Sequence, residues 1–386
     1  MFKDFPMDAI NNSLENVEAI INSNKEEIKK LVAQNNKTYK NFMKPLMELD
    51  NKLNDYFTPI AHLNSVCDSE ETRQAFSSCL PALSVYSSEI SQNKDIYNAV
   101  MEISKEDNLT QEQKKVIKDM LEMFKLGGVH LEDSKKKRLI EINTRLSELS
   151  DSFNKNLLDA TNKFEIILKD DTHIKNMPET DKNTAKTNAG YKFTLQAPSY
   201  TAFMTYCTDR SLREEVYKAY MTRAENNSDI IEEILKLKYE KAHILGYKNY
   251  RDMRNETMSC PSATEALQFL ENLSEKGKPY ALKELKELQE FAKTKNIDKI
   301  ESYDTAYLSN LLKKEVLGFD SEQFRPYFEK DNVINGLFLF LQKLFNINFQ
   351  EVKDTPIWHE SVKCYDLLES NNQPFARLYI DLEARA

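Results

Sequence analysis

Glycine and proline are scarce in this sequence. The chain of 386 residues contains seven glycines and eleven prolines, and no stretch rich in Pro, Ser and Gly marks a flexible linker. Because these residues usually separate one element from the next, their scarcity predicts long helices joined by short turns. The composition is 40% hydrophobic and 30% charged, which is typical of a globular protein with a buried core rather than of a disordered chain.

Cysteine is also sparse. The chain has five cysteines, an odd number, at widely separated positions and without a Cys-x-x-Cys pair. They are Cys67, Cys79, Cys207, Cys260 and Cys364. Such usage fits a reducing compartment better than a disulfide framework.

Long hydrophobic runs are missing as well. The segment Met1 to Pro6 does not lead from a basic start into an apolar run, so it does not resemble a secretory signal peptide. No apolar stretch approaches the roughly 20 residues that a membrane helix needs. Together with the cysteine usage, these absences predict a cytoplasmic protein with no membrane partner.

The charge is acidic and evenly spread. The net charge is −9, and no basic stripe is present that could neutralise a phosphate backbone. The densest basic run, Lys135 to Arg138, lies in a helical pattern with Glu132, Asp133 and Glu141 around it, as on a solvated helix face. We therefore expect no nucleic-acid partner.

Apolar residues recur at helical spacing along most of the chain. Two amphipathic helices are expected between Met7 and Tyr56, a third from Ser69, and a fourth from Thr110 to the stop at Gly127 and Gly128. Further helices are expected from Ser199, with capping signals at Ser211 and Ser262 and stops at Gly246 and near Lys295, and then over Tyr303–Val316 and Val333–Phe345.

The strongest period lies between Leu131 and Ala160. It consists of Leu139, Ile142, Leu146, Leu149, Phe153 and Leu157. This stripe predicts one long buried helix. A coiled-coil seam is the alternative, but the stripe runs for fewer than three to four heptads, which favours packing within the chain.

Two places depart from the helical pattern. Phe164–Leu168 and Lys192–Leu195, separated by the polar stretch Asp181–Gly190, predict a small two-stranded element. Val362–Leu367 and Phe375–Leu382 alternate around a turn and predict a hairpin. The sequence then ends at Arg385 and Ala386, directly after a strand, so we expect a truncated core. No internal repeat supports a solenoid.

No active site is evident from the residues. A zinc peptidase needs two histidines one helical turn apart with a glutamate beside the first. The nearest approach is His359-Glu360, but Lys363 stands where the second histidine belongs, and Pro356 argues against a helix. We therefore expect His359 to be a half-buried ring beside Trp358 that helps to hold the hairpin, and we assign no catalytic or metal-binding residue.

The sequence also shows no motif for a catalytic nucleophile. The sequence contains no Gly-x-Ser-x-Gly elbow, no glycine-rich phosphate loop and no cysteine with a histidine near it in sequence. The sequence does not exclude a catalytic triad formed by residues that are distant in the chain and close in space.

Several stretches resemble the zinc oligopeptidase family of thimet oligopeptidase and bacterial oligopeptidase A, in that family's order. They are Phe124–Leu131, Ile140–Leu149, Asn156–Thr161, Leu212–Tyr220, Thr222–Ala224, Asn227–Leu235, Leu245–Tyr250, Arg325–Phe328, Val333–Phe338, Ile357–His359 and Leu378–Arg385. Together they span about residue 120 to the end, whereas the first hundred residues match only in helical character. Glu383, Ala376-Arg377 and Tyr303 depart from the residues that the family usually has at these positions.

The resemblance implies a mainly α fold, a multi-helical half-channel of the neurolysin and thimet type with a few short strands. It also implies zinc as the family's cofactor and short unstructured peptides as substrates, cleaved inside cells. In the family, the zinc-binding His-Glu-x-x-His helix and the other catalytic residues follow the strand that ends here near Arg385, so none can be carried onto this chain. Arg377, Tyr379 and Asp381 are interpreted as ordinary sheet positions, and substrate-binding residues stay unassigned.

These observations predict three regions and leave three hypotheses. The regions are an N-terminal helical region over 1–160, a second helical region with a short β element over 161–356, and a truncated hairpin that begins the catalytic region over 357–386. The leading hypothesis is the N-terminal part of a zinc oligopeptidase, inactive unless a missing C-terminal catalytic half complements it. The alternatives are a non-catalytic module that binds peptides along the strand Phe375–Leu382, and a structural helical protein that self-associates.

Overall fold

The computed structural model describes residues 4–383. Two features of the sequence analysis fall outside these residues, namely the beginning of the segment Met1 to Pro6 and the chain end at Arg385 and Ala386. Helices make up most of the described chain, and the strands form two small antiparallel sheets, so the prediction of a mainly α fold is confirmed. Within this range, no helix is both long and apolar enough to span a lipid bilayer.

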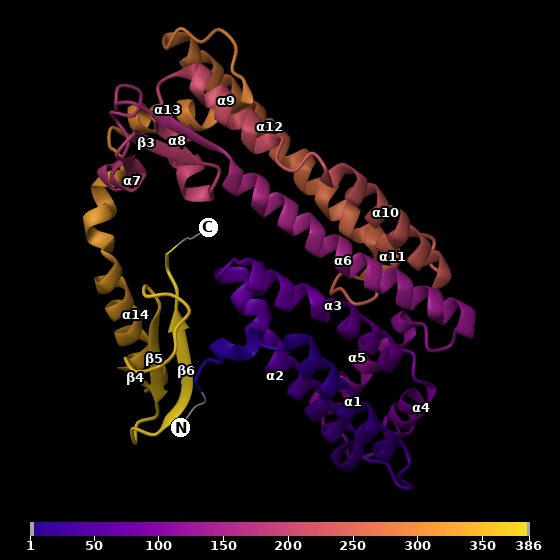
Figure 1. Ribbon diagram of the computed structural model, residues 1–386. Helices are drawn as coiled ribbons and strands as arrows, with labels where there is room; N and C mark the ends of the chain where they lie inside the picture. The colour runs from indigo at the N-terminus through magenta and orange to yellow at the C-terminus, as the bar shows by residue number, and fades with distance from the viewer. Residues whose placement is uncertain (1–3, 384–386) are drawn as a thin grey trace.

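Five helices form a bundle at the N-terminal end of the chain (Figure 1). They are α1 (Ser13–Val32), α2 (Lys44–Val66), α3 (Glu70–Ser91), α4 (Lys94–Ile103) and α5 (Gln111–Gly127), with the short helical segments η1 (Met7–Ile10) and η2 (Tyr39–Met43). Their apolar faces meet in a core in which Phe42, Ile96 and Phe124 are fully buried. Four of the five helices were predicted.

The helix α4 was not predicted, although its sequence carries two signals. Asn93 caps this helix, because the Asn93 side chain accepts hydrogen bonds from the backbone N–H groups of Asp95 and Ile96. Ile96, Val100 and Ile103 then lie one turn apart and are fully buried. A helix of ten residues gives a shorter periodic signal than its longer neighbours.

Several helix ends lie where capping residues predicted them. Ser69, Thr110 and Ser262 each accept the backbone N–H of the third residue along the chain. Gly128 ends α5 with a φ of +82°, in the left-handed region that favours glycine.

The cap predicted at Ser211 is wrong. Helix α9 (Arg210–Met221) begins one residue before Ser211, and its N-cap is Asp209, whose carboxylate accepts the N–H of Leu212 at 3.0 Å. An aspartate carries a full negative charge to the positive end of the helix dipole, whereas a serine hydroxyl does not. The charged acceptor two residues earlier therefore sets the start of the helix.

One long helix, α6 (Asp133–Lys163), crosses the molecule diagonally in Figure 1. Its 31 residues correspond to a length of roughly 46 Å. Leu139, Ile142 and Leu149 are buried, and the helix lies against α3 and against α10 (Asn227–Ile244). The apolar stripe therefore packs within the chain, as predicted, although Leu146, Phe153 and Leu157 are only half-buried.

A small sheet follows α6. Its strands are β1 (Glu165–Leu168), β2 (Lys186–Thr187) and β3 (Gly190–Thr194), in the order β1-β3-β2, with α7 (Glu179–Ala185), α8 (Ala197–Tyr206) and α9 beside it. The prediction of two strands was incomplete, because the polar stretch Asp181–Gly190 contains both β2 and most of α7. Phe193 of β3 and Phe203 of α8 are buried, with ring centroids 4.9 Å apart.

The rest of the chain contains helices and a second sheet. The elements are α11 (Tyr250–Asn255), α12 (Ala263–Thr294), η3 (Ser302–Asp304), α13 (Thr305–Leu317), η4 (Ser321–Phe328), α14 (Lys330–Phe345), β4 (Asn348–Glu351), β5 (Lys363–Leu368) and β6 (Pro374–Ile380). The predicted hairpin is confirmed as β5 and β6, which pair antiparallel with Cys364 opposite Tyr379. Strand β4 was not predicted, and it completes a sheet of order β4-β5-β6.

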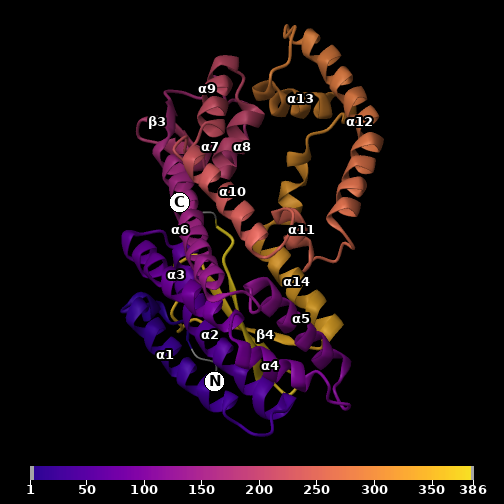
Figure 2. The same cartoon turned by 90° about the vertical axis from the view of Figure 1, so that its right-hand side faces the viewer.

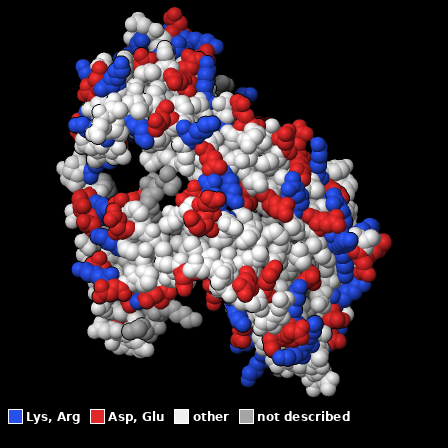
Figure 3. Space-filling view, in the orientation of Figure 1, with Lys and Arg blue, Asp and Glu red and all other residues white. Residues whose placement is uncertain are grey.

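The elements are arranged in a ring (Figures 1 and 2). From the N-terminal bundle, α6 leads up to α7, α8, α9 and α13, and α14 leads back down to the second sheet, which lies beside the N-terminal segment. The space-filling view in Figure 3 shows an opening between α14 and the face formed by α3 and α6. The predicted division into 1–160, 161–356 and 357–386 stays a prediction.

Candidate functional site

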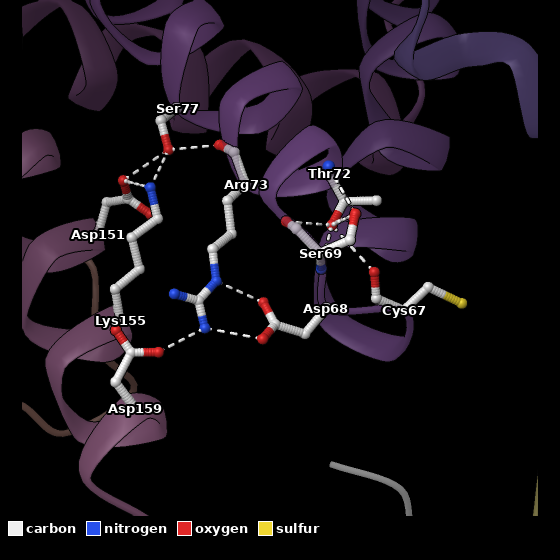
Figure 4. A network of polar contacts seen from close by, with 9 residues as sticks. All are labelled: Cys67, Asp68, Ser69, Thr72, Arg73, Ser77, Asp151, Lys155 and Asp159. Atoms are coloured by element: carbon white, nitrogen blue, oxygen red, sulfur yellow. Dashed lines mark hydrogen bonds and ion pairs between the residues drawn. The ribbon is translucent and has the colours of Figure 1, made fainter. Parts of the chain in front are cut away.

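A polar network joins the two helices on one side of this opening (Figure 4). Arg73 of α3 donates to both carboxylate oxygens of Asp68, at 2.6 and 2.7 Å, and to Asp159 of α6 at 2.7 Å. The two carboxylates raise the pKa of the Arg73 guanidinium above its ordinary value. Arg73 therefore fastens the start of α3 to the second half of α6.

The same network contains a serine beside a lysine. Ser77 Oγ contacts Lys155 Nζ, and both lie 2.8 Å from Asp151 Oδ2. A Ser–Lys dyad needs a neutral amine that can take the serine proton. Lys155 is instead paired with the carboxylate of Asp151, and a protonated amine has no lone pair for this role. This is a spatial arrangement of the kind that the sequence left open, but its chemistry is that of an ion pair.

The charges of the network also argue against an anion site. Arg73 and Lys155 carry two positive charges, and they face three carboxylates, those of Asp68, Asp151 and Asp159. The sum is negative, so the network does not attract the carboxylate of a peptide. On the face shown in Figure 3, Lys and Arg are likewise mixed with Asp and Glu. The contacts support a structural role in holding α3 on α6.

A cluster of four rings, which we call the aromatic joint, lies where the second sheet meets the N-terminal bundle. It consists of Phe5, His62 of α2, Trp358 and Tyr379 of β6. The His62 and Trp358 rings meet edge to face at 4.3 Å, and Phe5 lies 5.4 Å from His62 and 5.0 Å from Trp358. The rings of Trp358 and Tyr379 are 5.4 Å apart. The joint thus brings together three segments that are far apart in the sequence.

Polar contacts surround the aromatic joint. Trp358 Nε1 donates to Asp381 Oδ2 at 2.8 Å, and Cys67 Sγ donates to the Trp358 carbonyl at 3.4 Å. Arg377 donates to both carboxylate oxygens of Asp366, at 2.7 and 3.2 Å, and it also binds Asp4 at 3.1 Å. The N-terminal segment is therefore tied to the sheet by a charged contact as well as by Phe5.

Two polar atoms of the joint are buried without a hydrogen-bond partner among residues 4–383. They are His62 Nε2 and the Tyr379 hydroxyl. Burial lowers the pKa of His62 below its ordinary 6.5, and the negative charge of Asp381 opposes this shift. The arrangement therefore favours a neutral imidazole.

His359 takes no part in this ring cluster. It lies in a bend before β5, where its Nδ1 accepts the N–H of Ser361 at 3.2 Å and lies 2.8 Å from the Ser361 hydroxyl. The histidine ring that lies against Trp358 is that of His62, which the sequence analysis did not single out. The sequence contains no local signal for this contact, because the two residues lie on separate elements.

A cavity of about 430 Å³ lies between α14 and the second sheet. Its wall includes Phe338 and Phe349, whose rings stack at 4.1 Å, together with the ion pair Lys363–Asp331. The apolar wall and the ion pair make it a candidate site for a segment that offers both apolar and polar groups.

Two family models match the chain. One, described as the neurolysin and thimet oligopeptidase N-terminal domain, matches residues 17–136. The other, described as peptidase family M3, matches residues 203–386. The chain belongs to the family of thimet oligopeptidase and oligopeptidase A. The predicted family is confirmed. The first model also covers most of the first hundred residues, in which the sequence analysis found only helical character.

Relatives of known name agree with this family. Oligopeptidase A of Haemophilus influenzae is 37% identical over 388 residues, which cover 96% of this chain and 57% of the relative. Oligopeptidase A of Escherichia coli is 37% identical over 385 residues, which cover 95% of this chain and 57% of the relative. A probable cytosolic oligopeptidase A of Arabidopsis thaliana is 30% identical over 96% of this chain and 56% of its own length. The chain thus spans little more than half the length of these relatives.

The residues present do not fit the zinc ion of the oligopeptidase family. No three His, Cys, Asp or Glu side chains in the described part of the chain lie together as a metal-binding group. His62 Nε2 is enclosed by rings, and Asp381 already accepts the indole N–H of Trp358. Neither residue therefore serves as a zinc ligand in this arrangement.

The chain exposes much of its apolar surface on two helices. The large exposed residues of α12 are Leu267, Phe269, Leu270, Leu273, Tyr280, Leu282 and Leu285, and those of α14 are Val333, Leu337, Leu339, Phe340, Leu344 and Phe345. No residue of α14, all of which lies within the described range, is buried. Surfaces of this kind usually mark contacts with another polypeptide segment.

Proposed function

We propose that this chain forms the peptide-binding part of a zinc-dependent oligopeptidase that hydrolyses short, unstructured peptides, and that it is inactive by itself. The observation that carries the proposal is the 37% identity to two oligopeptidases A over nearly the whole chain, in a structure whose described residues offer no zinc site. The proposal assigns the base and the metal ligands to other polypeptide. A cytoplasmic location is part of the proposal, and the printed name of the cytosolic Arabidopsis relative supports it.

The exposed faces of α12 and α14 are the proposed contact for that polypeptide. In proteins most helical stability comes from packing of an apolar face, yet α14 exposes Phe340 by 60% and Phe345 by 62%. The part of the bacterial relatives that lies outside the matched region is large enough to cover such faces, because the match takes in only 57% of each relative. We therefore propose that zinc-binding polypeptide packs on these two helices.

The first test measures zinc content and cleavage of a quenched-fluorescent peptide with the purified 386-residue chain. We expect no zinc after dialysis and no cleavage. We also expect zinc-dependent cleavage when the chain is mixed with the part of Escherichia coli oligopeptidase A outside the matched region. Stoichiometric zinc with turnover by the chain alone would reject the proposal.

Matched variants locate the contact. Phe340→Asp places a charge on the exposed face of α14 and should abolish complementation, because a buried unpaired carboxylate is costly at an interface. Met221→Asp changes a residue of similar exposure, 61%, at the end of α9, and should leave complementation intact. Equal loss in both variants would mean that α14 is not the contact.

A second candidate function is peptide binding without hydrolysis. Strand β6 is an edge strand of its sheet, and it exposes Phe375 and Leu378. An extended peptide can add to such an edge by main-chain hydrogen bonds. Saturable binding of a peptide that loses affinity when its backbone nitrogens are methylated would support this function, and binding that is insensitive to methylation would reject strand addition. A mass that rises with concentration, without peptide binding, would favour the self-associating structural protein.

A further inference from the structure

The second sheet meets the N-terminal bundle at the aromatic joint, beside the contact between Arg377 and Asp4. On the far side from the joint, the sheet lies against α14, which has no buried residue within the described range. The contacts at the joint link positions that are very far apart, since Cys67 and Trp358 are separated by 291 residues and Asp4 and Arg377 by 373. The joint therefore closes the ring of elements around the opening seen in Figure 3.

We propose that the aromatic joint is an acid-sensitive closure, which holds the sheet against the N-terminal bundle while His62 is neutral and releases it when His62 takes up a proton. Release would let α14 and the sheet move away from the bundle and would widen the opening. The proposal concerns the ring itself and does not depend on peptidase activity.

The geometry around His62 explains why a proton would disturb the joint. The ring lies 4.3 Å from Trp358 and 5.4 Å from Phe5, so its neighbours there are apolar faces. Its Nε2 is buried and has no acceptor among residues 4–383. A protonated imidazole carries an N–H donor on both nitrogens, so the charged form would bury a donor that has no partner.

Charged groups of β6 and of the N-terminal segment also lie at the joint. Asp381, which follows β6, attracts a proton to His62, but its carboxylate already accepts the N–H of Trp358. Arg377 of β6 is neutralised by Asp366 and Asp4. The remaining polar groups at the joint are the Cys67 thiol, directly after α2, and the Tyr379 hydroxyl of β6. Burial outweighs the attraction of Asp381, because the pKa of His62 is lowered.

The sign of the pH dependence follows from this shift. In the open state His62 is solvated and has an ordinary pKa of about 6.5, whereas in the closed joint its pKa is lower. Closure is therefore fully favoured above about pH 6.5 and weakens as the pH falls from there through the lowered pKa of the closed joint. Each unit of difference between the two pKa values changes the ratio of open to closed forms by about tenfold.

Trp358 makes the transition directly observable, since it is the only tryptophan of the chain. We expect its emission to shift to longer wavelength, and its quenching by acrylamide to increase, as the purified 386-residue chain is taken from pH 8 to pH 5. Far-UV circular dichroism should stay constant over the same range, because the helices do not unfold. The change should be reversible on return to pH 8.

Three variants test the role of His62. His62→Gln removes the titrating group and should abolish the transition. Asp381→Asn keeps an acceptor for the Trp358 N–H but removes the negative charge that raises the pKa of His62 in the closed joint, so it widens the difference between the two pKa values and should move the midpoint of opening to higher pH. His359→Gln is the matched control, because His359 is next to Trp358 in sequence but bonds to Ser361, and this variant should behave like the unaltered chain.

Other outcomes reject the proposal. An unchanged transition in His62→Gln would exclude His62 as the sensor. Loss of fluorescence without a wavelength shift and without better acrylamide access would mean that protonated His62 quenches Trp358 inside a closed joint. If His62→Gln does not fold, Asp381→Asn still decides, because an unmoved or lowered midpoint contradicts the mechanism.

Discussion

The N-terminal bundle and the helices α12 and α14 differ in what covers their apolar faces. In the bundle, Ile117 and Phe124 of α5 are buried among residues of the neighbouring helices. Helix α14 has at least as many large apolar residues, yet Phe340 and Phe345 remain exposed. Helical periodicity is therefore a guide to which face is apolar, whereas the partner of that face must be found elsewhere.

This difference has a consequence for stability. The bundle buries its faces within the chain, so its free energy of unfolding comes from internal packing. In α12 only the C-terminal end is packed, where Leu288 and Phe291 meet Leu308 of α13, and α14 contacts the second sheet through Phe338. Most of the apolar surface of these two helices stays exposed. They are the region in which a second polypeptide would change stability most.

The largest expected difference between the two regions is in the free energy of unfolding that is lost when one phenylalanine in each is replaced by alanine. Phe124→Ala removes a fully buried ring from the bundle core and should lower the free energy of unfolding by about 3–5 kcal/mol. Phe340→Ala, in the exposed face of α14, should change it by less than about 0.5 kcal/mol. Urea denaturation followed by circular dichroism measures both. Equal costs would mean that the α14 face is covered in solution.

Hydrogen exchange should reveal a smaller difference between the regions. Amides of α14 should exchange about a hundredfold faster than those of α5, a ratio that corresponds to about 2.7 kcal/mol of opening free energy. The helix α6, which packs against both α3 and α10, is an internal control with slow exchange. Equal protection of α14 and α5 at high protein concentration that disappears on dilution would instead point to coverage by a second copy of the chain.

Local signals explain why much of the fold could be predicted. The long period of α6, the caps at Thr110 and Ser262 and the alternation in β5 and β6 each lie within one short stretch of sequence. Strand β2 and most of α7 were missed because a polar stretch has no apolar period. Strand β4 has four residues, too few for alternation to stand out.

The candidate site was less predictable because it depends on contacts between distant segments. Phe5, His62 and Trp358 come from three such segments, and none is marked by a motif. His359 attracted attention because a glutamate follows it, whereas His62 is followed by a leucine. Arg73 likewise meets Asp159 only because α3 lies on α6. The family could be identified because it depends on stretches of sequence and not on which side chains meet in space.

The smallest expected effect concerns the start of α9, where either Asp209 or Ser211 could cap the helix. Asp209→Ala removes the carboxylate that accepts the Leu212 N–H and should cost about 1 kcal/mol of unfolding free energy. Ser211→Ala should cost almost nothing, because Ser211 lies inside the helix and alanine suits that position. Chemical denaturation of the two variants beside the unaltered chain measures the difference. A larger loss of unfolding free energy in Ser211→Ala than in Asp209→Ala would mean that Ser211 caps the helix. The expected order would mean that the charged acceptor sets the start of this helix, even though Ser211 and Glu214 have the spacing of a capping box.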